Sequence, residues 1–282
     1  MSLLPTSLHP VRQRSVLDAV WRYYTSGLNH DMALSFWREQ GVDVSLCEKI
    51  VGRPIVGHTP PALSRQDRTI AHLASLGFMI DEMLAAQVAH NSYDDDGMYD
   101  ALNDRAVLRL SDIAGTAGFI AISDQDGKRV NMAYWVDTHN SARGLYWPVG
   151  LPRKGDIVVV TKFAEDALVV AVAAAALGQF RGIGGPSVVP VSRHNLRLYW
   201  PWFAAQMSYV KPSELVFLAH DHELDARAFY HDEACRGPRL ILGDHACQSR
   251  TVVVDNTSLI TVMAVRGPGV ILDMVHAEAG YF

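Results

Sequence analysis

The sequence has few cysteines and no apolar run long enough to cross a membrane. Its 3 cysteines, Cys47, Cys235 and Cys247, contain no C-x-x-C pair, which excludes a structural zinc ribbon and a disulfide framework and predicts a reducing compartment. The N-terminus lacks the pattern of a secretory signal, and the apolar run at 167–177 is shorter than the roughly 17 to 25 residues of a transmembrane helix. We therefore expect a cytoplasmic protein without a membrane span.

Charged residues are also scarce. They make up 20% of the chain, against roughly 25% in typical globular proteins, while hydrophobic residues reach 49%. The net charge is −5 and no stretch is rich in Lys or Arg, so the electrostatic signature of a nucleic-acid-binding protein is missing. The composition therefore predicts no nucleic-acid partner. It favours a surface that is partly covered by other protein subunits, in a homo-oligomer or a larger assembly.

The most apolar part of the sequence lies near its middle. Residues 157–160 are a β-branched run, typical of a strand that is covered on both faces. Residues 167–177 are apolar on every side, which predicts a buried helix, and a second short strand is expected at 187–191. These segments form a β-α-β-like unit. The glycines at 182–185 follow the helix, so they fit a helix end better than a phosphate-binding loop.

The other segments complete the predicted fold. The spacing of apolar residues predicts helices over 12–28, 31–40, 64–90 and 98–110. Gly118–Val136 has the pattern of a hairpin, and short strands follow Glu214 at the spacing of a meander. We predict an α+β fold with a helical N-terminal part, a central β-α-β-like unit and a C-terminal antiparallel β meander. Residues 1–63 would be a helical segment with a strapping loop, and 64–282 the main domain.

Histidines gather in the last third of the chain and suggest a metal site. His220 and His222 end an apolar strand at alternate positions, which places both imidazoles on one face. Asp225, His231 and His245 are near enough in sequence to complete the site from neighbouring strands. The metal would be zinc or iron. Because no complete metal-binding motif is present, histidines that simply face water at strand ends are the alternative.

Aromatic side chains are concentrated in one further stretch, at Tyr199, Trp200, Trp202 and Phe203. Such density is typical of an exposed hot spot that binds a protein partner. A lid over the hydrophobic core is the alternative. We predict an interface at these four positions.

No complete catalytic motif of a serine hydrolase, zinc protease or kinase is present. The leading hypothesis is therefore a non-enzymatic binding protein, a subunit of a homo-oligomer or larger protein assembly. The second is a metal-dependent hydrolase or oxygenase that uses the histidine cluster. The third is a small-molecule sensor, because a helix followed by the hairpin at 118–136 resembles in topology the sensor domains of the GAF and PAS type.

Overall fold

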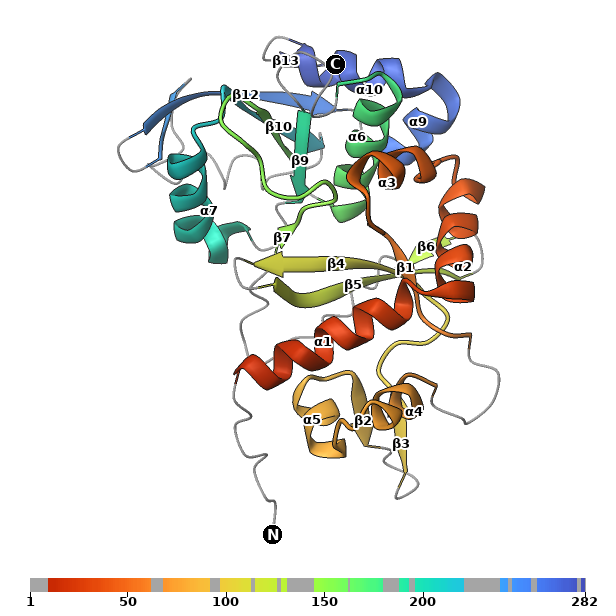
Figure 1. Cartoon of the computed structure of the whole chain (residues 1–282). Coiled ribbons are helices and arrows are strands. Elements are labelled where there is room, and N and C mark those ends of the chain that lie inside the picture. The colour runs from red at the N-terminus through yellow and green to blue at the C-terminus, as the bar shows by residue number, and fades with distance from the viewer. Residues whose placement is uncertain are drawn as a thin grey trace. The chain divides into compact units, whose positions relative to one another are not determined.

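The chain forms two compact units, each built from two separate stretches (Figure 1). Unit 1 comprises Met1–Phe36 and Pro54–Gly144, and unit 2 comprises Trp37–Arg53 and Leu145–Phe282. The computed structural model describes residues 10–61, 68–91, 97–112, 115–125, 128–130, 145–161, 163–179, 188–192, 196–220, 239–242, 245–254, 258–277 and 280–281. Its mixture of helices and sheets confirms the α+β class. None of the helices in these ranges is both long and apolar enough to cross a membrane.

Unit 1 combines helices with short antiparallel strands. Its helices are α1 (Pro10–Tyr24), most of α2 (Gly27–Glu39), α4 (Arg68–Ser75) and α5 (Ile80–Ala85). Its strands are β1 (Gly57–His58), β2 (Ala89–Asn91), β3 (Met98–Asp100), β4 (Ala106–Asp112), β5 (Gly115–Gln125) and β6 (Lys128–Val130). Strands β1, β4, β5 and β6 pair in that order, and β2 pairs with β3. The pairing of β5 with β6 confirms the predicted hairpin as far as Val130, and residues 126–127 and 131–136 of that prediction lie outside the described residues.

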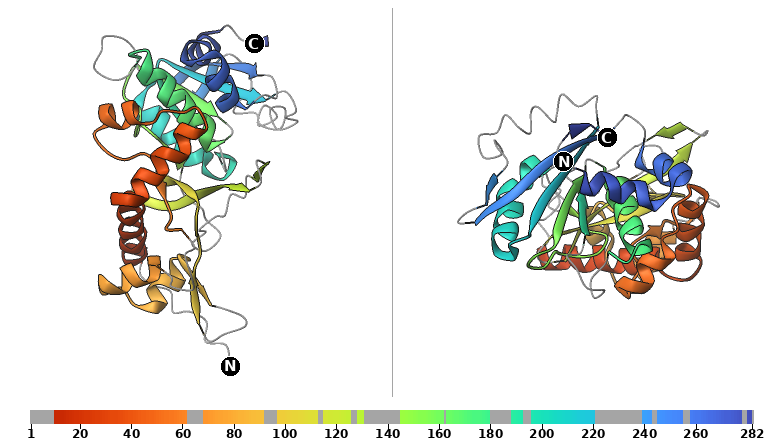
Figure 2. Two further views of the ribbon diagram at one scale, coloured as in Figure 1. Left: turned by 90° about the vertical axis from the view of Figure 1, so that its right-hand side faces the viewer. Right: turned by 90° about the horizontal axis from the view of Figure 1, so that it is seen from above.

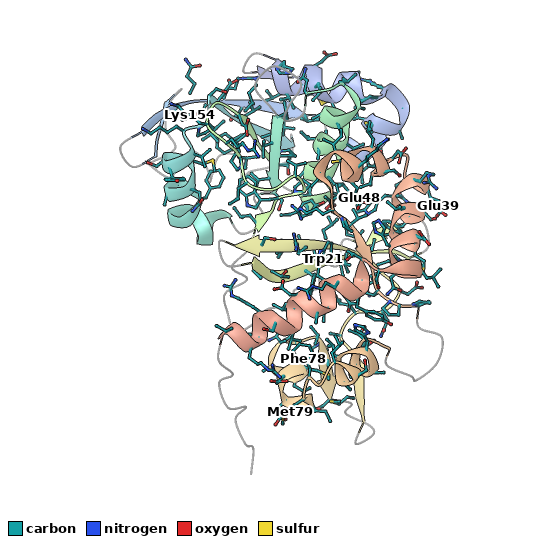
Figure 3. All side chains as sticks on the ribbon, viewed as in Figure 1. Trp21, Glu39, Glu48, Phe78, Met79 and Lys154 are labelled. Carbon is teal, nitrogen blue, oxygen red and sulfur yellow. The ribbon has the colours of Figure 1, made fainter. Side chains whose placement is uncertain are left out.

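The core of unit 1 surrounds α1 and includes buried residues of α4, α5, β2, β4 and β5. Apolar residues recur along α1 at helical spacing, so that one face of the helix is buried against β5. Trp21, labelled in Figure 3, stacks on Phe119 of β5 with 6.2 Å between ring centroids. The guanidinium of Arg109 lies 5.2 Å from the centre of the same indole ring. The aromatic side chains therefore attach α1 to the strands.

Two helices predicted from apolar spacing differ in the structure, where one is divided and the other is replaced by strands. Residues 64–90 were expected as one helix, but Gly77 adopts a left-handed φ of +83° and separates α4 from α5. Residues 98–110 were expected as a second helix and instead contain β3 and β4. Because Ala106, Val107 and Leu108 are all buried, β4 is covered on both faces. A strand that is buried on both faces has apolar residues at consecutive positions, so these residues also match the spacing of a helix, which explains the wrong prediction.

Glu82 connects the start of α5 to α1. Its carboxylate accepts hydrogen bonds from the guanidinium of Arg12 and, at 2.8 Å, from the backbone amide of Met79. The hydrogen bond from Arg12 lowers the pKa of Glu82 below its usual value, with a smaller contribution from the Met79 amide. Because the folded-state pKa is the lower one, this carboxylate stabilises unit 1 at neutral pH. The stabilisation is lost as the pH falls through the folded-state pKa.

Replacing Glu82 by glutamine is therefore expected to flatten the acid side of the pH dependence of thermal stability. The variant should melt below the wild type at about pH 7, and this difference should shrink at an acidic pH below the lowered folded-state pKa of the wild-type carboxylate. Thermal melts followed by circular dichroism measure the effect. Asp81→Asn is the matched control, since Asp81 is an exposed acid in the same helical turn. A difference of equal size at both pH values would show that Glu82 does not act through its charge.

Unit 2 is built around a mostly parallel sheet. The strands of this sheet are β8 (Ile157–Thr161), β9 (Val188–Ser192), β10 (Glu214–His220), β11 (Arg239–Leu242), β12 (His245–Val254) and β13 (Gly280–Tyr281). The short strand β7 (Leu145–Tyr146) also belongs to unit 2 but not to this sheet. The helices of unit 2 are α3 (Ser45–Val51), α6 (Ala164–Ala176), α7 (Leu196–Val210), α9 (Leu259–Arg266) and α10 (Pro268–His276). The parallel strands lie in the order β9-β8-β10-β12-β13, and β11 pairs antiparallel with β12. Figure 2 shows α7 on the opposite face of this sheet from α6, α9 and α10.

The predicted β-α-β unit is present as β8-α6-β9. The β8 run is buried at every position, and α6 is buried from Ala164 to Ala175 except at Glu165. The alanines of α6 allow α3, α9 and α10 to pack closely against it. At the C-terminus, the expected antiparallel pairing occurs between β11 and β12. Residues 259–265 and 270–276, expected as strands, lie instead in α9 and α10, since Gly267 and Pro268 give α10 its own start.

Candidate functional site

The carboxyl edge of the parallel sheet is the first candidate site. β8 and β10 are neighbours in the sheet. The next strand beside β8 is β9, and the next strand beside β10, in the opposite direction, is β12. Ligands of doubly wound sheets bind outside the carboxyl ends of the strands at such a reversal of strand order. In unit 2 this point lies where Thr161 ends β8 and His220 ends β10.

Two hydroxyl groups lie at this edge. Thr161 is paired in register with Ser192, the last residue of β9, and both residues are fully buried. The Thr161 hydroxyl donates to the backbone oxygen of Phe163 at 2.8 Å, which supports the turn into α6. Within the described residues, the Ser192 hydroxyl has no hydrogen-bond partner. A buried hydroxyl of this kind at a strand end is a feature of ligand sites as well as of structural turns.

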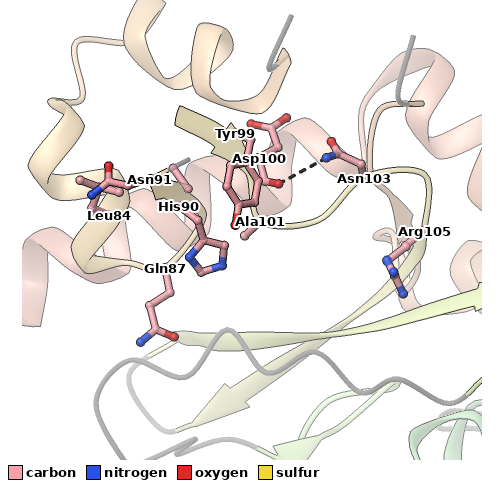
Figure 4. Close-up of a pocket in the computed structure, with 10 residues that line it drawn as sticks. Leu84, Gln87, His90, Asn91, Tyr99, Asp100, Ala101, Asn103 and Arg105 are labelled. Carbon is pink, nitrogen blue, oxygen red and sulfur yellow. Dashed lines mark hydrogen bonds between the residues drawn. The ribbon is translucent and has the colours of Figure 1, made fainter. Parts of the chain in front are cut away.

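A pocket in unit 1 is the second candidate site (Figure 4). The cavity has a volume of about 820 Å³ and lies beside the β2–β3 hairpin. Figure 4 shows His90, Tyr99 and Gln87 on one side of it, and Asn103 and Arg105 on the other. Its remaining lining residues are Leu84, Ala89, Asn91, Asp100 and Ala101.

Asp100 is the acidic residue among the described lining residues, and it has a structural task. It is buried, and its two carboxylate oxygens accept hydrogen bonds from the backbone amides of Thr69 at 2.8 Å and Ile70 at 3.0 Å. These amides belong to the first turn of α4, where a negative charge is favourable. Asp100 thereby attaches the hairpin to α4, and the backbone oxygen of Asp100 also accepts a bond from Asn103 at 3.3 Å.

The backbone at the pocket is unusual at two positions. Gln87 and Asp104 have positive φ angles of 55° and 49°, which only a few per cent of non-glycine residues adopt. Asp104 directly precedes Arg105, whose backbone amide donates to the hydroxyl of Thr59 at 2.8 Å. Thr59 in turn donates its backbone amide to the oxygen of Arg105 at 2.9 Å. Unfavourable backbone angles held by surrounding bonds are concentrated at functional sites.

The structure places two of the predicted metal ligands, His220 and His245, at opposite ends of the parallel strands. His220 is the last residue of β10 and lies in register with Val254 of β12, whereas His245 is the first residue of β12. At about 3.3 Å per residue, His245 is roughly 30 Å along the strand from that end, so it does not join His220. His222, Asp225 and His231 lie outside the described residues. No group of three or more potential metal ligands comes together in the ranges that the structure describes, and the metal site stays a prediction.

The four aromatic residues predicted at an interface lie on α7. Phe203 is fully buried in unit 2 and stacks on Trp147 with 6.3 Å between ring centroids, so its side chain serves the core. Tyr199, Trp200 and Trp202 are part of the same helix, but their side chains lie outside the described part of the chain. For these three positions the interface stays a prediction.

The fold defines the class of the protein as α+β, with a doubly wound sheet joined to a smaller antiparallel unit. No protein-family model matches the chain, and no curated protein matches it in sequence. Among solved structures, the chain is similar to a DNA primase domain from Pseudomonas aeruginosa. The two share 17% sequence identity with a TM-score of 0.60, over 94% of this chain and 78% of that domain.

This similarity contradicts two predictions from the sequence. The chain was expected to be a non-enzymatic binding subunit of an assembly, with a metal-dependent hydrolase or oxygenase and a sensor as alternatives, and none of these is supported by the likeness to a primase domain. Nucleic acid was excluded as a partner, and the same likeness contradicts that exclusion. A net charge sums the whole chain, whereas nucleic acid responds to the local field at a binding face, so the net charge alone does not exclude such a partner.

The pocket residues were missed because their stretch of sequence was read as helix. His90 is the last residue of one predicted helix, and Tyr99 falls in the next one. In the structure they are directly opposite each other on β2 and β3. The signal that could have revealed the hairpin is the loop between them, since Asp96-Gly97 is a turn-forming pair flanked by short segments.

Proposed function

We propose that this protein acts on nucleic acid, as a cytoplasmic enzyme related to DNA primases. The supporting observation is the fold likeness to a DNA primase domain, which extends over 94% of the chain and therefore includes both units. A likeness limited to the doubly wound sheet would carry less weight, because that architecture hosts many unrelated activities. The reversal of β-strand order between β8 and β10 also supports the proposal, because doubly wound sheets bind nucleotides at such a point.

Binding of single-stranded DNA is the first test of this proposal. The full chain is titrated into a fluorescently labelled oligothymidine, and the dissociation constant is measured by anisotropy at several salt concentrations. We expect saturable binding that weakens with salt, because phosphate contacts release counterions. Bovine serum albumin is a suitable control, because it is acidic, as is this chain with its net charge of −5. An acidic protein without a binding site should not bind the oligonucleotide at neutral pH. Failure to bind at about 50 mM salt would overturn the proposed function.

The enzymatic part of the proposal needs its own measurement. Ribonucleotide incorporation is followed on a single-stranded template in the presence of Mg²⁺ or Mn²⁺, since divalent ions stabilise the transferring phosphoryl groups in such reactions. Product that depends on both template and divalent ion supports a primase-type enzyme. Strand binding without any product would restrict the proposal to a nucleic-acid-binding protein.

A further inference from the structure

We infer that the pocket of unit 1 holds a nucleobase of a single-stranded nucleic acid, stacked against Tyr99 and His90. This inference rests on the proposed function and adds to it the region of unit 1 that would contact the nucleic acid. Its starting point is the register of the hairpin, in which His90 and Tyr99 are directly opposite each other on adjacent strands. Directly opposite residues of an antiparallel pair project from the same face, so both rings border the same cavity.

Both rings are accessible to a ligand. Tyr99 is 41% exposed, and His90 is exposed as well. Their centroids are 5.7 Å apart and their planes are inclined by 50°, so the two rings are not stacked on each other. An aromatic face that the protein leaves uncovered in a cavity is the element on which single-stranded bases stack.

The polar groups around the rings suit the edge of a base. Gln87, Asn91 and Asn103 each carry a carboxamide, which both donates and accepts hydrogen bonds. The Watson–Crick edges of bases present donors and acceptors in the same alternating manner. Arg105 adds a positive charge on the side of the cavity opposite the rings (Figure 4).

The charge of the pocket does not oppose such a ligand. The carboxylate of Asp100 is turned to the first turn of α4, where the amides of Thr69 and Ile70 bind it. Between β2 and β3 the sequence also contains Asp94–Asp96, which lie outside the described residues. Because these acidic residues do not attract phosphate, base binding here depends on stacking and not on phosphate contact. Its volume of about 820 Å³ lies in the usual range for small-ligand sites, about 300 to 1,000 Å³.

The test compares Tyr99→Ala with Tyr99→Phe in the full chain. For a labelled oligothymidine, Tyr99→Ala should weaken binding between about 5-fold and 150-fold, the range for losing one base–aromatic stack. Tyr99→Phe keeps the ring and should bind like the wild type. Tyr209→Ala is the matched control, because Tyr209 is a tyrosine that is 86% exposed on α7. Thermal melts check that all three variants are folded.

Two further readouts separate stacking from other causes. The fold-change of Tyr99→Ala should be the same at about 50 mM and 200 mM salt, since loss of a stack releases no counterions. An oligonucleotide that contains 5-iodouracil should form a photocrosslink in the peptide that contains Tyr99 or His90.

Each outcome has a defined meaning. Wild-type binding with Tyr99→Ala unchanged and no crosslink in this hairpin would overturn the pocket and leave the proposed function standing. No wild-type binding would overturn both. If a mononucleotide binds as tightly as the oligonucleotide, the pocket would not be a site for single-stranded nucleic acid.

Discussion

Replacing Asp100 by alanine is expected to lower the free energy of unfolding of unit 1 by about 3 to 5 kcal/mol. The buried carboxylate accepts the amides of Thr69 and Ile70 at 2.8 and 3.0 Å. Hydrogen bonds to a charged group contribute about 1.5 to 3 kcal/mol each, and their loss leaves amides at the start of α4 without these acceptors. Because Asp100 lies on β3, both the hairpin and α4 should lose protection.

Hydrogen–deuterium exchange measured by mass spectrometry resolves this effect within a chain of two units. Peptides from 68–75 and 98–100 should exchange faster in Asp100→Ala, while peptides from α6 stay protected. Asp100→Asn keeps one oxygen acceptor and should lose about half as much stability. Asn103→Ala is the neighbouring control, because Asn103 is exposed and its bond to Asp100 is long, so we expect less than about 0.5 kcal/mol. Unchanged exchange in 68–75 would show that Asp100 does not hold α4.

Replacing Gly41 by alanine is expected to destabilise unit 2 by about 2 to 5 kcal/mol. Gly41 follows α2 with a φ of +79°, where a side chain costs roughly 1 to 2 kcal/mol. A β-carbon at this position would also lie 2.8 Å from the β-carbon of Ala264 in α9. Relieving that contact requires a backbone shift, and overpacking of this kind costs about 1 to 3 kcal/mol.

Gly52 offers a matched control for the backbone part of this effect. It ends α3 with a φ of +73°, and a β-carbon there meets nothing within 4 Å. Gly52→Ala should therefore show the conformational cost alone. Urea denaturation of both single variants, and of Gly41→Ala combined with Ala264→Gly, measures the packing part as a coupling energy. Equal destabilisation by Gly41→Ala and Gly52→Ala would mean that α9 moves aside freely.

The part of the fold that the sequence predicts best is the part buried on all sides. The run at 157–160 and the alanine-rich segment after it have no polar face, so strand, helix and central position follow from composition alone. Residues 259–266 show the limit of this reasoning. Their β-branched residues favour a strand, but packing against α6 stabilises a helix instead.

The candidate sites were harder to predict because they depend on neighbours that are distant in sequence. The position of His220 at the end of an apolar strand was recognised from the sequence. That β8 lies beside this strand, and that the order of strands reverses between them, becomes visible only from the pairing of Val160 with Phe217. The unit 1 pocket needs a hairpin whose strands are 3 residues long, too short for a periodic pattern to be detected.

The interleaved chain has a consequence for how the protein is synthesised. Residues 37–53 belong to unit 2, but the ribosome makes them before most of unit 1 and long before α6, against which α3 packs. At about 5 to 20 residues per second, the buried face of α3 with Cys47 waits roughly 5 to 25 s for its partner helix. During that interval Cys47, the buried residue of α3, lacks the core that covers it in the folded protein. A fragment that starts at Leu145 lacks this segment and should be recovered only when residues 37–53 are supplied with it.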